Sequence, residues 1–164
     1  MSAAAALTRV DAPAVLMGVD IVESDRLARA AARGGEVFTR HVSTPAERAL
    51  GPGVAAFSVK ESLIKAVGVR PPGFTWHDFE AVTAPPPGWA ARLLEEAAAE
   101  LAVTTGVPLT GGASYAVRGA SARAALERLR PADGVPVGVA RWGRGDGLFV
   151  SLAVVYVEEE GVPS

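Results

Sequence analysis

The apolar residues of this chain follow two different periods, and the two periods predict both strands and helices. Residues 14–23 read AVLMGVDIVE, a β-branched apolar run with one glycine and one internal acid, which is typical of a buried strand. Residues 54–68 read VAAFSVKESLIKAVG, where Ala56, Phe57, Leu63, Ile64 and Val67 form one apolar helical stripe. Gly68 is the expected end of that helix.

The other segments alternate between the two patterns without a regular βαβ order. In SDRLARAAARGG, Ser24 or Asp25 is the expected helix cap, and the glycines at 34 and 35 are the expected stop. The further predicted elements are helices at 43–48, 88–106 and 121–129 and strands at 74–82, 111–119, 135–142 and 148–159. This order favours an α+β fold, a small mixed or antiparallel sheet packed with helices. The last strand is almost continuously apolar, which suits a central or interface position.

Length and composition predict a single domain. The 164 residues are 49% hydrophobic, enough for one core, which we expect to occupy residues 14–160 after a loose leader at 1–13. The chain has no cysteine, which excludes disulfides, thiolate metal sites and a cysteine nucleophile.

The charge balance excludes one large class of partners. With 16 basic and 18 acidic residues the net charge is −2, which argues against a general nucleic-acid binder. No segment has the pattern of a secretory signal or a membrane span, so we expect a soluble cytoplasmic protein without a membrane partner.

Lysine occurs at two positions only. Of the 16 Lys and Arg residues, Lys60 and Lys65 are the lysines, and Glu61 lies one helical turn before Lys65. An ordinary solvated Glu–Lys pair is one interpretation. The apolar surroundings and the absence of other lysines favour a second one, in which compact ammonium groups were selected to contact phosphate or donate protons.

Asp20 is an acid inside an apolar strand. A buried carboxylate must be paired, protonated or bound to a metal, and it could simply cap a neighbouring helix. Together, Asp20 and Glu61 would also suit Mg2+, which takes one or two carboxylates and completes its shell with water and substrate phosphate. With a lysine beside them, these groups describe a phosphate-transfer site.

The order of motifs resembles the holo-acyl-carrier-protein synthase family, the small class of 4'-phosphopantetheinyl transferases. The motifs are GVDIVESDRL at 18–27, a TPAE helix start, FSVKESLIKAVG at 57–68 and HDFEAV at 77–82. The resemblance is clear over residues 14–82 and looser from 106 to 159. A helix near 88–102 is identified as an insertion relative to the family.

The resemblance implies Mg2+-dependent transfer of the phosphopantetheine arm of coenzyme A to a serine of an acyl carrier protein. By matching positions, Asp20 and Glu61 fall on the metal-binding acids. Lys60 falls on a basic residue near the coenzyme A phosphates, and Lys65 on the lysine that stabilises the leaving phosphate. The serine proton would go to Glu61 or to a metal-bound water.

The resemblance also implies two kinds of protein contact. Arg26 falls on a family arginine that meets the carrier protein, and Arg29 and Arg33 share its helix face, so an acidic carrier helix could dock there. Family members of this length class are homotrimers, so the resemblance implies a homotrimer. They act in fatty acid or polyketide biosynthesis, and we expect that this protein could serve one specialised biosynthetic pathway.

The chain departs from the family pattern at several positions. Ala56 stands where the family usually has an arginine, and Gly68, Val69 and Arg70 stand where it usually has G-T-G. Coenzyme A would therefore contact Gly68 and Arg70. Arg70 or Arg141 would replace the coenzyme A contacts that the family makes through the missing residues. No histidine follows residue 77, where the family has a late Ser-His motif. These departures leave an alternative open: a repurposed relative that binds carrier proteins or acts on a carrier-tethered acyl chain.

Overall fold

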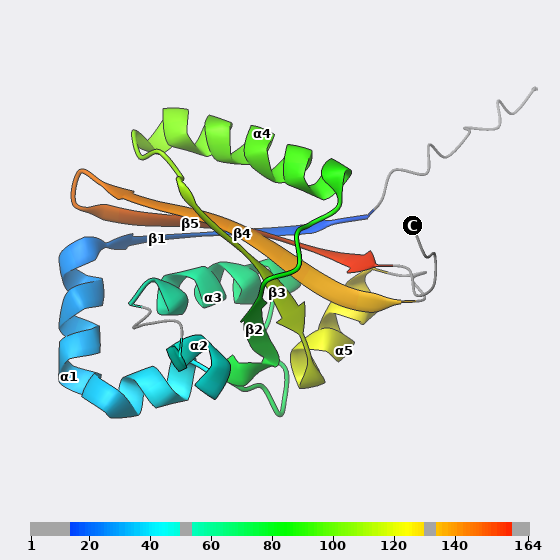
Figure 1. Ribbon diagram of the computed structural model, residues 1–164, viewed down its shortest axis with the longest axis horizontal. Helices are drawn as coiled ribbons and strands as arrows, with labels where there is room; N and C mark the ends of the chain where they lie inside the picture. The colour runs from blue at the N-terminus through cyan, green and yellow to red at the C-terminus, as the bar shows by residue number, and fades with distance from the viewer. Residues whose placement is uncertain (1–13, 50–53, 130–133, 159–164) are drawn as a thin grey trace, which may run out of the picture.

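An antiparallel sheet with helices on both faces forms the body of the protein (Figure 1). The computed structural model describes residues 14–49, 54–129 and 134–158. Within these ranges the strands are β1 Leu16–Glu23, β2 Phe79–Val82, β3 Gly111–Val117, β4 Val135–Gly145 and β5 Leu148–Glu158. The helices are α1 Ser24–Val42, α2 Pro45–Ala49, α3 Val54–Val67, α4 Gly88–Thr105 and α5 Gly119–Arg128, with a 3-10 turn, η1, at Trp76–Asp78. This arrangement confirms the predicted α+β class.

The strand order β1-β5-β4-β3-β2 places the most apolar strand in the interior of the sheet. β5 pairs with β4 through a tight hairpin and with β1 on its other side. Asp146 and Gly147 turn the hairpin with φ of 51° and 75°, the left-handed conformation that such short connections require. Because β5 is covered on both faces, its side chains are apolar at nearly every position, as the sequence pattern predicted.

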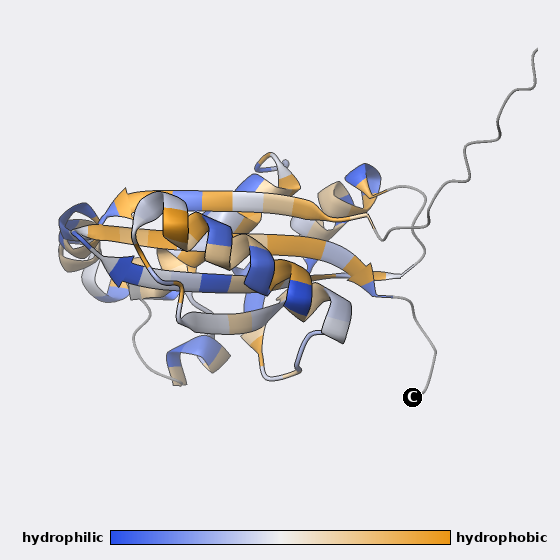
Figure 2. Ribbon diagram, turned by 90° about the horizontal axis from the view of Figure 1, so that it is seen from above, coloured by the Kyte–Doolittle hydropathy of each residue, from blue (hydrophilic) through white to orange (hydrophobic). Residues whose placement is uncertain are grey.

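Two apolar clusters lie on opposite faces of the sheet. On one face α1, α3 and α5 cover the strands, with buried residues that include Leu63, Phe79 and Val155. On the other face α4 packs on β4 and β5, with Leu94, Val107 and others buried beneath it. Viewed from the α4 side, β5 is coloured hydrophobic along most of its length, whereas its neighbours β1 and β4 carry polar stretches (Figure 2). The sheet therefore separates two layers of core.

Several predicted elements differ in detail from the observed ones. α1 does break at the glycine pair, where Gly35 has φ 51° and ψ −135°, but a second helical segment continues from there to Val42. The predicted strand at 74–82 begins as η1, and only residues 79–82 pair in the sheet. The helix predicted at 88–106 is α4, which ends at Thr105. The leader at 1–13 lies outside the described residues. None of the helices in the described ranges is long and apolar enough to cross a membrane.

Gly18 sets the distance between β1 and α3. A Cβ at this position would overlap the carbonyl oxygen of Ser62 and the backbone nitrogen of Ala66. The strand and the helix therefore meet backbone to backbone, which only a residue without a side chain permits. Since residues alternate along a strand, Asp20 points toward α3 on the same face as Gly18.

We expect Gly18→Ala to push α3 away from β1 and to lower the free energy of unfolding by about 1–3 kcal/mol, as overpacked cores do. Gly88→Ala is the matched control, because a Cβ there meets nothing within 4 Å. Chemical denaturation of both variants measures the difference. Equal stability of the two variants would contradict the close backbone contact.

Candidate active site

Asp20 lies against α3 and is held by two of its side chains. The Asp20 Oδ1 atom accepts a hydrogen bond from Lys65 Nζ at 2.9 Å, and Oδ2 accepts one from Ser58 Oγ at 2.7 Å. The Asp20 side chain is 12% exposed and that of Lys65 is 52% exposed. The carboxylate is therefore largely buried, while its cationic partner reaches solvent.

Glu61 belongs to the same patch. Ser58, Glu61 and Lys65 are spaced three and four residues apart on α3, so they share one face of the helix. Since Asp20 contacts the first and the last of them, Glu61 lies on the helix turn between its two contacts. The structure thus brings together Asp20, Glu61 and Lys65, the acids and the lysine that the sequence singled out.

Arg70 neutralises Glu61. Its Nη2 atom donates to Glu61 Oε1 at 2.7 Å, and its guanidinium lies 5.5 Å from the ring centroid of Phe74 and 5.0 Å from that of Trp76. These cation–π contacts hold the arginine beside the helix. The predicted cofactor-binding residue Arg70 therefore lies next to the predicted metal ligand Glu61.

Two acids, each paired with a half-exposed cation, have the chemistry of a site for a divalent cation and a phosphate. Among the described residues no cluster of three or more His, Cys, Asp or Glu side chains is present that could hold a metal without other ligands. Mg2+ commonly binds proteins through one or two carboxylates and completes its shell with water and substrate phosphates. The donor set of Asp20 and Glu61 fits that ion, and Lys65 and Arg70 fit the phosphates.

Lys60 has a different environment from the one expected. It is completely buried, and its ammonium donates to Val42 O at 2.6 Å, Glu47 Oε1 at 2.7 Å and Trp76 O at 3.2 Å. All three donors are therefore used inside the protein. Burial lowers the pKa of Lys60, opposed by the hydrogen bond and the charge of Glu47. This geometry argues against the predicted contact of Lys60 with coenzyme A phosphates and assigns it a structural role.

Glu47 extends this internal network. Its Oε1 also accepts from the Thr44 backbone at 2.9 Å, and its Oε2 from the Ala81 backbone at 3.2 Å. The ion pair of Lys60 and Glu47 thus joins α3 to α2, to the end of α1 and to β2. From the sequence, Glu47 was only part of a predicted helix start. Its partner Lys60 lies on another helix, so no local pattern indicated the ion pair.

The remaining predicted residues lie directly after α3 and on α1. Gly68 ends α3 with φ 105°, and a Cβ there would lie 2.6 Å from Nη1 of Arg128, which donates to the carbonyls of Ala66 and Val67. Gly68 therefore has a structural reason to be glycine. The predicted docking residues Arg26, Arg29 and Arg33 are exposed on α1. α1 follows directly on β1, the strand that carries Asp20.

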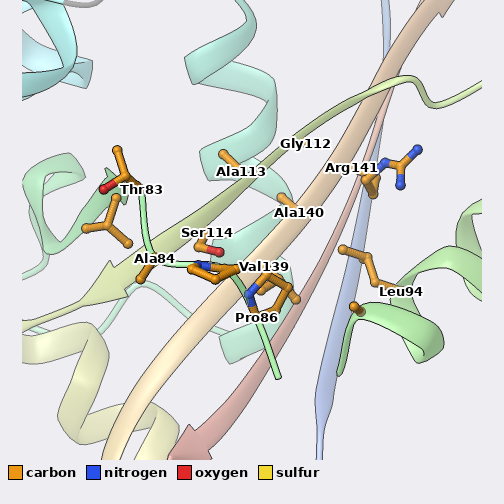
Figure 3. A pocket seen from close by; sticks show the side chains of 13 residues that line it. Thr83, Ala84, Pro86, Leu94, Gly112, Ala113, Ser114, Val139, Ala140 and Arg141 are labelled. Carbon is orange, nitrogen blue, oxygen red and sulfur yellow. The ribbon is translucent and has the colours of Figure 1, made fainter. Parts of the chain in front are cut away.

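A separate hollow lies beside α4 (Figure 3), and Asp20 is not among the residues that line it. Its volume is about 470 Å³, and its walls come from the 82–86 connection, α4, β3 and β4. The lining is largely apolar and includes no acid. Arg141 lies at its edge, but the guanidinium donates to Leu109 O from Nε at 3.1 Å and from Nη2 at 2.6 Å. The charged groups suited to phosphate chemistry are therefore on the α3 face.

Ser58 and Ser151 were not identified from the sequence. Ser58 Oγ contacts Asp20, and Ser151 Oγ lies 3.1 Å from Ser58 Oγ. The spacing of Ser58 from Glu61 and Lys65, which places all three on one helix face, was the one sequence feature that could have indicated Ser58. The sequence offered no signal for Ser151, which lies in an apolar strand.

Comparisons with known proteins point to one family. The family model of the 4'-phosphopantetheinyl transferase superfamily matches residues 16–117. The chain is 40% identical over 72 residues to a holo-[acyl-carrier-protein] synthase of Koribacter versatilis (strain Ellin345), a match that covers 38% of this chain and 58% of that protein. It is 38% identical over 95 residues to a synthase of the same name from Methylobacterium sp. (strain 4-46), covering 52% of this chain and 70% of that protein.

A solved structure shares the fold. It is the Chronobacterium ammoniagenes ACPS-CoA complex, with a TM-score of 0.53 and 17% sequence identity. The superposition covers 89% of this chain and 99% of that chain. At this identity the likeness concerns the fold alone.

Removing one partner of the Lys60–Glu47 pair should destabilise the protein strongly. Lys60→Met or Glu47→Gln should each cost about 3–5 kcal/mol, because a buried charge loses its partner, and the double variant Lys60→Met/Glu47→Leu should cost less than the sum. Arg118→Met is the control, since its pair with Glu80 is surface-exposed and worth at most about 1 kcal/mol. Urea denaturation measures these differences. A folded Lys60→Met variant that keeps its stability but loses affinity for coenzyme A would instead support the phosphate contact.

Proposed function

Because the chain belongs to the 4'-phosphopantetheinyl transferase superfamily, we propose that it transfers the 4'-phosphopantetheine arm of coenzyme A to a serine of an acyl carrier protein. The observation that carries the proposal is the patch where Asp20 of β1 meets Glu61 and Lys65 of α3. This patch combines two acids with two cations at a half-exposed surface. Such a set is what displacement at a pyrophosphate requires, since negative charge develops there in the transition state.

In this proposal Asp20 and Glu61 would hold Mg2+. The ion supplies charge neutralisation at the pyrophosphate. The pairs seen in the structure, Lys65 with Asp20 and Arg70 with Glu61, neutralise both acids. The same two cations are then available to the phosphate oxygens, because their side chains are 52% and 50% exposed.

The transfer forms one bond and breaks one bond. The carrier serine oxygen bonds to the β-phosphorus of coenzyme A, and the bond from this phosphorus to the bridging oxygen breaks. Adenosine 3',5'-bisphosphate leaves with that oxygen. Glu61 accepts the serine proton, and Lys65 stabilises the charge on the leaving group.

Partners and cellular setting belong to the same proposal. Arg26, Arg29 and Arg33 on α1 suit the acidic helix of a carrier protein, and charge complementarity speeds and orients such docking. The protein would act in the cytoplasm, as a homotrimer, in fatty acid, polyketide or another specialised biosynthesis. Exposed Met17, Val19 and Ile21 on β1 support a subunit contact, because α4 packs over β4 and β5 and not over this strand.

One observation favours a second candidate function. The chain has no histidine beyond residue 77, and β4 reads VPVGVARW where the family has its Ser-His motif. A relative without that motif could bind carrier proteins, or act on an acyl chain already attached to one, without transferring the arm. Intact Asp20, Glu61 and Lys65 favour the transferase.

We expect Glu61→Gln to lower the transfer rate at least about 100-fold, because the proposal makes Glu61 both a metal ligand and the proton acceptor. Intact mass spectrometry of apo carrier proteins incubated with coenzyme A and Mg2+ measures the transfer, with a metal-free sample as reference. Glu80→Gln is the matched control: its side chain is 19% exposed and ion-paired, as Glu61 is at 18%, but it lies on β2. Activity retained by Glu61→Gln would refute its role. Carrier binding without any mass gain would favour the second candidate.

The arginine face of α1 should control carrier affinity. Arg29→Glu/Arg33→Glu should raise KM for the carrier with little change in kcat. The two substitutions lie outside the acid patch, which is formed by Asp20, Glu61 and Lys65. The increase should shrink as salt is added, since screening weakens exposed charges. Arg92→Glu/Arg123→Glu makes the same change of net charge on α4 and α5 and should leave KM unchanged. Equal effects of both pairs would mean that only net charge matters.

A further inference from the structure

Two buried serines stand behind Asp20. Ser58 on α3 and Ser151 on β5 have no exposed surface. The Ser58 hydroxyl lies 2.7 Å from Asp20 Oδ2 and 3.1 Å from the Ser151 hydroxyl. The Ser151 hydroxyl also lies 2.9 Å from the Ser58 carbonyl oxygen. The two hydroxyls and the carboxylate therefore form one continuous hydrogen-bonded chain through the core between the helix and the sheet.

The chemistry of the groups determines which hydroxyl donates each hydrogen bond. An ionised carboxylate can only accept hydrogen bonds, so Ser58 must give its single hydroxyl proton to Asp20 Oδ2. Ser58 Oγ then has no proton left for Ser151, so Ser151 is the donor toward Ser58, at the hydroxyl, the carbonyl or both. The Ser58 proton thus points to Asp20, and the Ser151 proton points to Ser58.

The two carboxylate oxygens of Asp20 have different hydrogen-bond partners. Oδ2 is tied inward to Ser58, whereas Oδ1 faces Lys65, whose side chain is half-exposed. The carboxylate is therefore held in one orientation, with one oxygen directed to the core and the other to the site. An aspartate anchored by Lys65 alone would lose this orientation whenever the lysine moved to a phosphate.

We propose that Ser58 and Ser151 are positioning residues that orient the Asp20 carboxylate for metal binding through Oδ1. The inference rests on the proposed function, because it assumes that Asp20 is a metal ligand. Ser58 acts on Asp20 directly, and Ser151 acts only through Ser58. Groups that hydrogen-bond to a metal ligand commonly change metal affinity by about 10- to 100-fold.

Mn2+ binding tests the proposal without relying on transfer activity. The probe is Mn2+ alone, titrated into the protein and followed by the EPR signal of the free ion. We expect Ser58→Ala to weaken Mn2+ binding about 10-fold and Ser151→Ala to weaken it less. The double variant should bind like Ser58→Ala, because the two serines act in series.

Ser62→Ala is the matched control. Ser62 is also a fully buried serine of α3, but its hydroxyl is bonded to Val59 O within the helix. It should lose a similar amount of thermal stability and keep its Mn2+ affinity. If Ser58→Ala does not fold, Ser151→Ala still tests the hydrogen-bonded series, because Ser151 is the member farthest from Asp20.

The outcomes separate this inference from the proposed function. Wild-type affinity in both Ser58→Ala and Ser151→Ala, with binding abolished by Asp20→Asn, would overturn the inference and leave the metal site standing. An equal loss of affinity in Ser62→Ala would also overturn it, because general loosening of α3 would then be the cause. Failure of the wild-type protein to bind Mn2+ would remove the metal site and the inference together.

Discussion

The contact between β1 and α3 at Gly18 is the constraint on which the site depends. Because Gly18 lacks a side chain, the helix backbone approaches the strand closely enough for Asp20, on the same face, to reach Ser58 and Lys65. β1 is in turn held by its pairing with β5, the most buried strand. The acid patch is therefore built on two rigid elements, as a catalytic geometry requires, and not on loops.

The two lysines of the chain have different environments on one helix. Lys60 and Lys65 lie on different sides of α3. Lys60 points into the junction of α1, α2 and η1 and uses all its donors there, whereas Lys65 points to the half-exposed side with Asp20. The buried ion pair of Lys60 with Glu47 joins the helix to its neighbours, and this rigidity holds the face that carries Glu61 and Lys65 in place.

The α4 helix lies on the side of the sheet away from the site. It packs on the face opposite α3, with its own apolar cluster, and covers β4 and β5. The acid patch on the α3 face is left untouched. α4 therefore packs on the sheet without taking part in the strand–helix contact that positions Asp20.

The sequence by itself determined the order and type of most elements, since periodicity, glycine stops and helix caps are local signals. It also identified Asp20, Glu61 and Lys65 together, because an acid in an apolar strand and a Glu–Lys pair on an apolar helix are unusual wherever they occur. Only the tertiary structure decided that Lys60 is internal, because its partner Glu47 comes from another helix. Only the tertiary structure brought Ser151 to Ser58, 93 positions away in the chain, since hydrogen bonds between distant segments depend on packing that no local pattern records.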